Sequence, residues 1–259
     1  MIKAENITKS FRKPNEKDKR VEAVKDISLE INDYDVVAIV GESGSGKSTL
    51  ARMLAFIDRP DYGSITVDKL EVTNCTKKEL AKSRRIVQLV MQDAASSMDP
   101  HQKIKEILAE PLKLLLQMDK KQQKQYISQL LDVVCLEKSV LEKYPNELSG
   151  GQQKRVCIAR ALAAKPTHII FDESFSGLDV TLKKQILCLL KDIRKEMQIS
   201  YLIITHDLAI AMYMADAIYV MRSGKIVETV KNPKSYSDFE NSYSRELVNA
   251  VLSKRLALQ

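Results

Sequence analysis

The chain has 259 residues, a formal net charge of +7 at pH 7, 44% hydrophobic residues and 29% charged residues. This length and balance are typical of a globular protein with one large core or two modest lobes, and they exclude a disordered chain. The positive charge leaves three interpretations: a nucleic-acid partner, an anionic membrane surface or a lysine-rich exterior. Basic residues are spread along the whole chain, which favours the exterior, and the densest run, residues 12–20, is predicted to form a solvated loop.

Neither a secretory signal nor a membrane-spanning segment is expected. Residues 1–13 contain several basic side chains and no apolar run. The most apolar long stretch, 199–221, contains His206, Asp207 and Asp216, which would be costly in hydrocarbon. The sequence therefore predicts a soluble chain that reaches a membrane only through partners. Its cysteines are scattered, which favours reduced thiols over a zinc or iron–sulfur site; they are Cys75, Cys135, Cys157 and Cys188.

Strands and one helix are predicted for the first 91 residues. An apolar run at 35–40 leads directly into glycine, as expected for a buried parallel strand. A helix is expected at 48–57, a turn at 62–64, and strands at 65–67 and 86–91.

A helical region follows, because apolar residues recur at intervals of three and four between 103 and 164. Pro111 and Pro145 are expected to separate its helices. Strand-like runs at 168–171, 200–204, 217–221 and 225–230 then alternate with helices at 181–197 and 207–215. This alternation predicts an α/β fold with a parallel sheet, crossover helices and an inserted helical lobe. A last helix is expected at about 245–258.

The strongest local signal is residues 41–49, which fit the phosphate-binding pattern G-x-x-x-x-G-K-[ST] between a strand and a helix. Its members are Gly41, Glu42, Ser43, Gly44, Ser45, Gly46, Lys47, Ser48 and Thr49. Glycines allow consecutive backbone N–H groups to surround phosphates, and the helix N-terminus adds positive potential. Lys47 is expected to bind the β- and γ-phosphates and Ser48 to bind Mg²⁺, which predicts a site for ATP and Mg²⁺.

A second apolar strand ends in Asp172 and Glu173. Adjacent carboxylates at a buried strand end are costly unless a cation or a substrate pairs with them. In a protein with the loop at 41–49, Asp172 is the candidate Mg²⁺ ligand, and Glu173 is the candidate general base for the attacking water. The alternative is an ordinary strand end.

Residues 148–152, LSGGQ, precede a helical pattern. A Ser-Gly-Gly turn at a helix N-terminus can bind an anion through its backbone N–H groups. The segment has no lysine of its own, so by itself it could also be an ordinary helix start.

Together these motifs resemble the ATP-binding cassette (ABC) ATPases. The loop at 41–49, LSGGQ, the FDE of 171–173, the SGLD of 176–179 and the ITHD of 204–207 occur in the family's order, and the resemblance extends from residue 1 to about 230. It implies a P-loop NTPase fold with a RecA-like α/β core, an N-terminal antiparallel β region and an inserted α-helical subdomain. Within a single domain, 1–259, the nucleotide-binding lobe would be 1–92 and 165–232, the helical subdomain 93–164 and the tail 233–259.

The resemblance also implies roles for single residues. Gln92 looks like the Q-loop glutamine, which senses Mg²⁺ and the transporter interface, and Asp179 looks like the D-loop aspartate. The signature that closes over the γ-phosphate of a second subunit's ATP would be Ser149, Gly150, Gly151 and Gln152. The catalytic candidates are then Lys47, Gln92, Glu173 and His206.

Three aromatic or imidazole side chains remain to be placed. His206 resembles the switch histidine at the γ-phosphate, with a structural strand-end histidine as the alternative. Phe11 is similar to the aromatic residue that stacks on adenine, with a core phenylalanine as the alternative. His101 and His168 match no motif and are interpreted as structural.

Two residues depart from the family pattern. Ser174 stands where proline is common after the glutamate, and Gly177 replaces the frequent alanine of the D-loop. Both are expected to loosen that turn without removing a catalytic group.

Two further segments resemble the peptide and nickel importer branch of the family: the extended Q-loop at 92–100 and the tail at 241–247, with Asn-Ser where His-Pro is usual. They imply an ATP-hydrolysing subunit that energises a binding-protein-dependent importer for peptides, nickel or metal chelates. It would act at the cytoplasmic face of the membrane with a second, different ABC ATPase, two permease subunits and an external solute-binding protein, and without nucleic acid. Many peptide-transporter members of this branch carry a cysteine-bearing C-terminal extension. No cysteine follows Cys188 here, so the resemblance favours nickel or a metal chelate over peptides.

The alternative is a soluble ABC-type ATPase that acts on nucleic acid or ribosomes. DNA-repair relatives separate the P-loop from the signature by long coiled coils, whereas here only about a hundred residues separate Lys47 from Ser149. Translation-factor relatives carry two cassettes in one chain, and this sequence has one.

Overall fold

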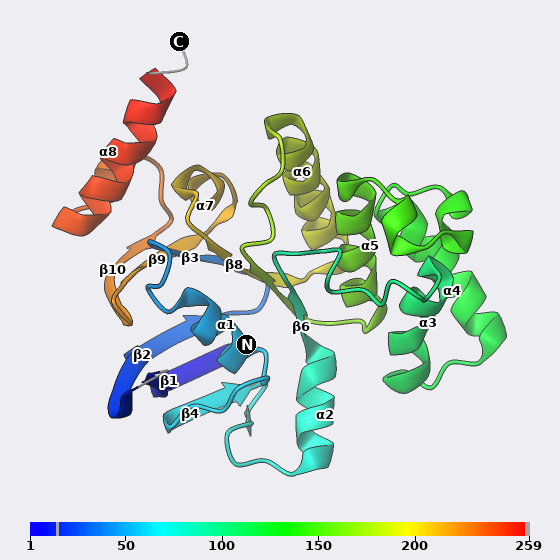
Figure 1. The fold of residues 1–259 in the computed structure, drawn as a ribbon, viewed down its shortest axis with the longest axis horizontal. Helices are drawn as coiled ribbons and strands as arrows, with labels where there is room; N and C mark the ends of the chain where they lie inside the picture. The colour runs from blue at the N-terminus through cyan, green and yellow to red at the C-terminus, as the bar shows by residue number, and fades with distance from the viewer. Residues whose placement is uncertain (14–15, 257–259) are drawn as a thin grey trace. The chain divides into compact units, whose positions relative to one another are not determined.

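The computed structural model describes residues 1–13 and 16–256. The chain divides into two compact units, Met1–Arg84 together with the chain from Ser200 onward, and Arg85–Ile199 (Figure 1). The subdomain bounds inferred from the sequence, at 92, 164 and 232, stay a prediction.

The first unit begins with an antiparallel sheet of strand order β2-β1-β4-β5. Its strands are β1 (Ile2–Lys13), β2 (Glu16–Ile31), β4 (Tyr62–Val67) and β5 (Leu70–Glu71). Ile2 lies opposite both Ile31 and Val67, and all three side chains are buried. The solvated loop predicted for 12–20 is wrong for the described residues, because cross-strand pairing continues there, as between Arg12 and Arg20. Residues 14 and 15 lie outside the described ranges.

A second group of strands in this unit has the order β10-β9-β3-β8. It consists of β3 (Val36–Val40), β8 (Ser200–Thr205), β9 (Ala217–Arg222) and β10 (Lys225–Lys231). β3 is parallel to β8 and β9, so that Val40 lies opposite Thr205 and Val220. Every residue of β3 is buried, which explains its continuous apolar run. Residues 41 and 206 therefore emerge at the same edge of these strands.

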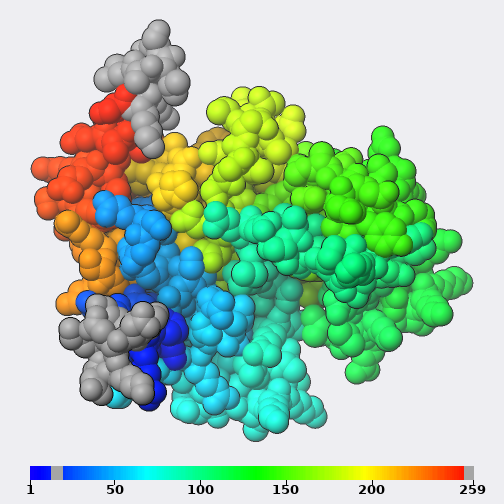
Figure 2. Space-filling model, in the orientation of Figure 1, coloured from blue at the N-terminus to red at the C-terminus, as the bar shows by residue number. Residues whose placement is uncertain are grey.

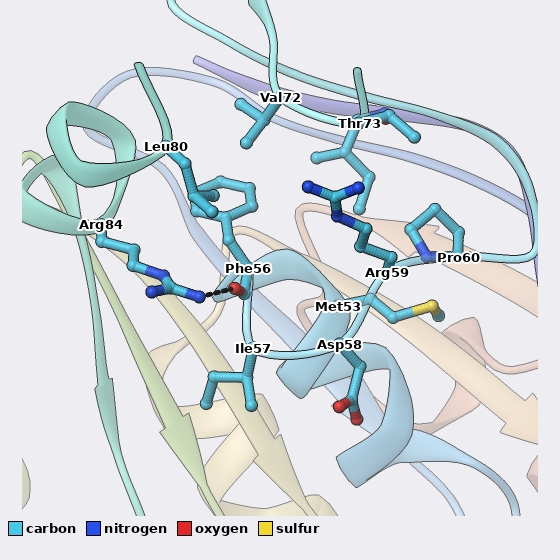
Figure 3. A pocket seen from close by; sticks show the side chains of 11 residues that line it. Met53, Phe56, Ile57, Asp58, Arg59, Pro60, Val72, Thr73, Leu80 and Arg84 are labelled. Carbon is cyan, nitrogen blue, oxygen red and sulfur yellow. Dashed lines mark hydrogen bonds between the residues drawn. The ribbon is translucent and has the colours of Figure 1, made fainter. Parts of the chain in front are cut away.

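Helix α1 (Lys47–Leu54) contacts β2 and β8, and α7 (Leu208–Met214) contacts β3 and β8. The loop after α1 is fixed by α2 (Lys77–Ile86), where Arg84 donates a hydrogen bond of 2.9 Å to the Phe56 carbonyl oxygen. Figure 3 shows this bond beside a small cavity of about 60 Å³. Helix α2 was not predicted from the sequence. Ser83 is its only buried residue, so the helix has no apolar stripe.

The last helix, α8 (Ser242–Leu256), follows a short 3₁₀ turn at Tyr236–Asp238. Figure 2 shows α8 in red against the orange of β10. It begins before the predicted start at 245, because Asn241 accepts a hydrogen bond of 3.0 Å from the Tyr243 N–H with its side chain and caps the helix. Residues 257 and 258 of the predicted helix lie outside the described ranges.

The second unit contains the parallel strands β6 (Val87–Val90) and β7 (His168–Asp172), with Val90 opposite Phe171. Helices α3 (Ile104–Leu114), α4 (Lys120–Val133) and α5 (Gly150–Ala163) contact one another, and α6 (Val180–Met197) follows β7. Short 3₁₀ turns lie at Lys138–Glu142 and Pro145–Glu147.

Pro111 does not separate two helices as predicted, because it lies inside α3. Proline within a helix removes one backbone hydrogen bond. The neighbouring side chains Ile107, Leu108 and Leu112 are fully or almost fully buried, so their packing keeps the helix continuous. Throughout 1–13 and 16–256, no helix is both long and apolar enough to cross a membrane.

Candidate functional site

The phosphate-binding loop of the first unit connects β3 to α1. Two of its glycines, Gly41 and Gly46, are required by close backbone approach. A Cβ on Gly41 would lie 2.1 Å from the Met221 carbonyl oxygen, and one on Gly46 would lie 2.0 Å from the Ala23 carbonyl oxygen. Gly46 is also the N-cap of α1 with a φ of 103°, a conformation that favours glycine. The loop therefore lies in close contact with the backbone of β2 and β9.

Lys47 is 4% exposed, and its ammonium group is folded onto the loop. It donates hydrogen bonds of 2.9 Å to the Gly41 carbonyl oxygen and 2.7 Å to the Glu42 carbonyl oxygen. A more distant contact of 3.4 Å joins it to the Ser45 hydroxyl. Phosphate oxygens could replace these acceptors, because Lys47 is the first residue of α1 and lies at the positive end of the helix dipole.

The remaining members of the loop differ in exposure. Ser48, in the first turn of α1, is exposed, as are Glu42, Ser43 and Gly44, whereas Thr49 is half-buried. Ser45 is buried, and its carbonyl oxygen accepts a hydrogen bond from the Gly224 N–H at 2.9 Å.

His206 lies at the same edge of the first unit as the loop. It directly follows Thr205, which is opposite Val40, the residue before Gly41. Its side chain is exposed, and the next residue, Asp207, caps α7 by accepting hydrogen bonds from the N–H groups of Ala209 and Ile210. This register places His206 at the strand edge from which the phosphate loop emerges, and its role at the γ-phosphate stays a prediction.

Phe11 lies on β1 opposite Val21 of β2 and is 44% exposed. The Lys9 ammonium lies 5.8 Å from the centre of its ring. An exposed aromatic face is open to stacking, so the alternative of a core phenylalanine is wrong.

Gln92, Asp172 and Glu173 all belong to the second unit and lie at or just after the ends of the paired strands β6 and β7. Val90 ends β6 opposite Phe171, so Gln92 and Asp172 emerge at the same edge. Gln92 is exposed, and the two carboxylates are half-buried. Glu173 has a φ of 49°, which is uncommon for a residue with a side chain. Oxygen donors of this kind are the ligands that Mg²⁺ prefers.

The signature segment forms the start of α5. Ser149 is the N-cap: its hydroxyl accepts a hydrogen bond from the Gln152 N–H at 3.3 Å, and its own N–H donates to the Gln152 side chain at 3.0 Å. Ser149 and Gly150 are exposed. Gly151 is half-buried, and a Cβ there would lie 2.9 Å from the Leu182 side chain. The helix N-terminus is therefore presented outward.

Asp179 is the N-cap of α6 and accepts a hydrogen bond of 2.9 Å from the Leu182 N–H. Its side chain is exposed, and so is the next residue, Val180. Leu182 therefore contacts two parts of the site: its N–H bonds to the Asp179 cap of α6, and its side chain lies against Gly151 at the start of α5.

Two polar side chains donate hydrogen bonds to the backbone at the start of the Q-loop, and neither contact was predicted from the sequence. The Lys154 ammonium, on a side chain only 3% exposed, donates to the carbonyl oxygens of Met91 at 3.1 Å and Gln92 at 3.3 Å. The buried Ser174 hydroxyl donates to the Val90 carbonyl oxygen at 2.6 Å.

A sequence signal for Lys154 exists. It precedes the apolar, buried Ile158 by four positions, so the two residues share the inward face of α5.

The residues present fit ATP and Mg²⁺. The first unit offers a loop in which Gly41 and Gly46 leave no space for a side chain, together with a buried lysine and an exposed hydroxyl at a helix N-terminus. The second unit offers carboxylates at a strand end and an outward helix N-terminus. These features define a nucleotide-binding cassette of the P-loop type.

Comparison with known proteins agrees. The family model described as "ABC transporter" matches residues 24–176. The metal-staphylopine import system ATP-binding protein CntF of Staphylococcus aureus is 39% identical over 98% of this chain and 100% of its own length. The nickel import ATP-binding protein NikE of Escherichia coli is 38% identical over 92% of this chain and 88% of its own. The oligopeptide transport ATP-binding protein OppF of Lactococcus lactis is 37% identical over 89% and 72%.

Solved structures give the same answer. The dimeric post-hydrolysis state of the ATP-binding cassette MJ0796, bound to ADP and Pi, has a TM-score of 0.78 at 29% identity, covering 91% of this chain and all of the other. The cbiO1 protein from Clostridium perfringens, part of the ABC transporter complex cbiONQ, also has a TM-score of 0.78, at 27% identity over 99% and 97%. The chain belongs to the ABC transporter family: it binds ATP, and its ATP hydrolysis is coupled to transport. The predicted α/β cassette fold is thereby confirmed.

Proposed function

We propose that the chain is the Mg²⁺-dependent ATPase of a binding-protein-dependent importer, working at the cytoplasmic face of the membrane. The observation that carries this proposal is the extent of the likeness to importer ATPases. CntF, which is named for metal-staphylopine import, matches 98% of this chain. Two of the three relatives described above are named for metals. We therefore assign nickel or a metal chelate as the solute in preference to a peptide.

In this proposal the phosphates of ATP lie against the loop at 41–49, with Lys47 as the cation that binds them. Phe11 stacks on the adenine. Ser48, Gln92 and Asp172 hold Mg²⁺, which when bound neutralises phosphate charge. Glu173 accepts the proton of the attacking water, and His206 donates to the γ-phosphate.

The outward N-terminus of α5 suggests that a second cassette completes each ATP site. Its exposed Ser149 and Gly150 present backbone donors that the phosphate loop of this chain does not supply. Asp179 is exposed at the start of α6, and in this proposal it contacts the same partner. We propose a different ABC ATPase as this partner.

The permease subunits need a docking surface, and the second unit offers one. A groove of about 320 Å³ is lined by residues of β6, α3 and α5, among them Leu89, Pro111, Leu114 and Cys157. Leu114 is 65% exposed, which is unusual for a leucine unless a partner covers it. We propose that a short helix of a permease lies in this groove.

Reconstitution tests the proposal. The chain would be combined with its partner ATPase and permeases in vesicles, with the solute-binding protein supplied outside. We expect ATP- and Mg²⁺-dependent uptake of a metal chelate, and loss of uptake with Lys47→Ala. Leu114→Glu is expected to block assembly with the permeases while ATP binding persists. ATPase activity that responds to nucleic acid or ribosomes and not to permeases would overturn the importer assignment.

A further inference from the structure

The segment at 241–247 places one side chain against the phosphate loop, within the first unit. Tyr243, the second residue of α8, is 1% exposed. Its hydroxyl accepts a hydrogen bond of 3.0 Å from the backbone N–H of Glu42. A buried tyrosine hydroxyl needs such a partner, and so does a backbone N–H next to a binding loop. The contact joins residues 201 positions apart along the chain.

Glu42 connects this tyrosine to the phosphate-binding lysine. While its N–H donates to Tyr243, its carbonyl oxygen accepts hydrogen bonds from the Lys47 ammonium at 2.7 Å and the Ser45 N–H at 3.2 Å. The Tyr243 hydroxyl thus holds the Gly41–Glu42 peptide, whose carbonyl oxygen, on Gly41, also accepts a hydrogen bond of 2.9 Å from Lys47. The Lys47 ammonium is therefore bonded to both peptide units that meet at Glu42.

The ring of Tyr243 also has a contact partner within the first unit. The guanidinium of Arg222, the last residue of β9, lies 4.5 Å from the centre of the ring, within range of a cation–π interaction. β9 is paired with β3, the strand that leads into the loop.

The start of α8 is in turn anchored to β10. Glu228 Oε1 accepts hydrogen bonds from the N–H groups of Glu240 at 2.6 Å and Asn241 at 3.0 Å, and the Asn241 side chain caps Tyr243. Burial opposes ionisation of the Glu228 carboxyl. The nearby Ser244 hydroxyl and the two N–H groups outweigh it, so the pKa of Glu228 is lowered. Glu228 Oε2 and the Ser244 hydroxyl themselves make no hydrogen bond of ordinary geometry.

We propose that Tyr243 is a positioning residue for ATP: from the C-terminal helix it holds the Gly41–Glu42 peptide of the phosphate loop in the conformation that receives the phosphates. The inference rests on the proposed role of the loop at 41–49. Tyr243 touches no substrate atom in this proposal. Its contribution is preorganisation, which lowers the cost of ordering the loop when the nucleotide binds.

The test is Tyr243→Phe, which keeps the buried ring and its contact with Arg222 and removes only the hydroxyl. The loss of one neutral hydrogen bond predicts an affinity for ATP about three- to tenfold weaker, measured by calorimetry with a non-hydrolysable ATP analogue. In the assembled transporter the KM for ATP should rise by a similar factor. The kcat at saturating ATP should stay within about twofold, because Glu173 and His206 are untouched.

Tyr201→Phe is the matched control, since Tyr201 is also a fully buried tyrosine of the first unit, on β8. Both variants should lower the unfolding temperature, but only Tyr243→Phe should change nucleotide affinity. Arg222→Met should weaken affinity in the same direction and by less. Equal affinities of wild type and Tyr243→Phe, or a fall in kcat without a change in KM, would overturn the inference.

A further arm separates this inference from the proposed function. Lys47→Ala should abolish measurable nucleotide binding, since it removes the cation itself. If Lys47→Ala binds the analogue normally, the proposed function of the loop fails. If Lys47→Ala loses binding while Tyr243→Phe behaves as wild type, only the positioning role of Tyr243 fails.

Discussion

The Ser174 hydroxyl joins two parts of the second unit through its hydrogen bond of 2.6 Å to the Val90 carbonyl oxygen. Ser174 directly follows Glu173, and Val90 ends β6 two residues before Gln92. The bond therefore ties the strand end that carries the candidate base to the beginning of the Q-loop. A proline, common at this position in the family, has no hydroxyl with which to make it. The departure expected to loosen this turn instead supplies a hydrogen bond across it.

Ser174→Ala is expected to lower the free energy of unfolding by about 1–2 kcal/mol, because a buried carbonyl oxygen loses a donor. It should also slow ATP turnover several-fold by releasing the Q-loop. Urea unfolding and steady-state hydrolysis measure the two effects. Ser139→Ala, an exposed serine, serves as the control. Wild-type values for Ser174→Ala in both assays would show that this hydrogen bond contributes neither to stability nor to ATP turnover.

Lys154 gives a pH-dependent prediction. Burial lowers its pKa from the ordinary 10.5 to about 8, opposed by weaker attractions to Cys157 and Asp93. Between pH 8 and 10.5 the unfolded chain therefore binds more protons at this residue, and stability relative to Lys154→Met should rise through that window. The rise should be at most about 3 kcal/mol. Urea unfolding of both proteins at pH 7 and pH 10 measures it, and an equal difference at the two pH values would contradict the assignment.

Glu173→Gln keeps the size and hydrogen bonding of the side chain but removes the carboxylate. We expect ATP to bind normally and hydrolysis in the assembled transporter to fall about 10²-fold or more, because no general base remains. Single-turnover hydrolysis measures the step, with Glu147→Gln, an exposed glutamate, as the control. Near-normal turnover in Glu173→Gln would assign the base to another group.

Mixed subunits test the shared ATP site. Ser149→Arg places a large cation at the exposed start of α5, where the proposal puts the partner's γ-phosphate. Paired with an intact partner, this variant should inactivate the site built on the partner's phosphate loop. Nucleotide binding at Lys47 of this chain should survive. Site-specific photolabelling with an ATP analogue distinguishes the two, and loss of labelling at Lys47 alone would refute the arrangement.

Much of the fold could be predicted because its buried strands read directly as apolar runs. β3 and β8 were placed to within one residue of their bounds. α2 was missed because it buries only Ser83, and Pro111 was misinterpreted because packing of the residues beside it outweighs one lost hydrogen bond. The local sequence pattern does not show how strongly tertiary packing stabilises such a segment.

The candidate site divides in the same way. Residues that belong to contiguous motifs, such as Lys47 and Ser149, could be found from sequence because the chemistry needs neighbours in the chain. Tyr243 could not, since its partner lies 201 positions away and the bond uses the backbone of Glu42. Lys154 could be predicted in part. Helical periodicity places it on the inward face of α5, but it does not predict which carbonyl oxygens its ammonium contacts.

The left-handed backbone of Glu173, with its φ of 49°, sets stability against chemistry at one position. Such a conformation costs a residue with a side chain on the order of 1 kcal/mol, a cost that glycine avoids and asparagine reduces. A laboratory selection for heat resistance alone would therefore enrich glycine or asparagine at position 173 and discard the carboxylate. Only a selection that demands continued solute uptake would retain glutamate there.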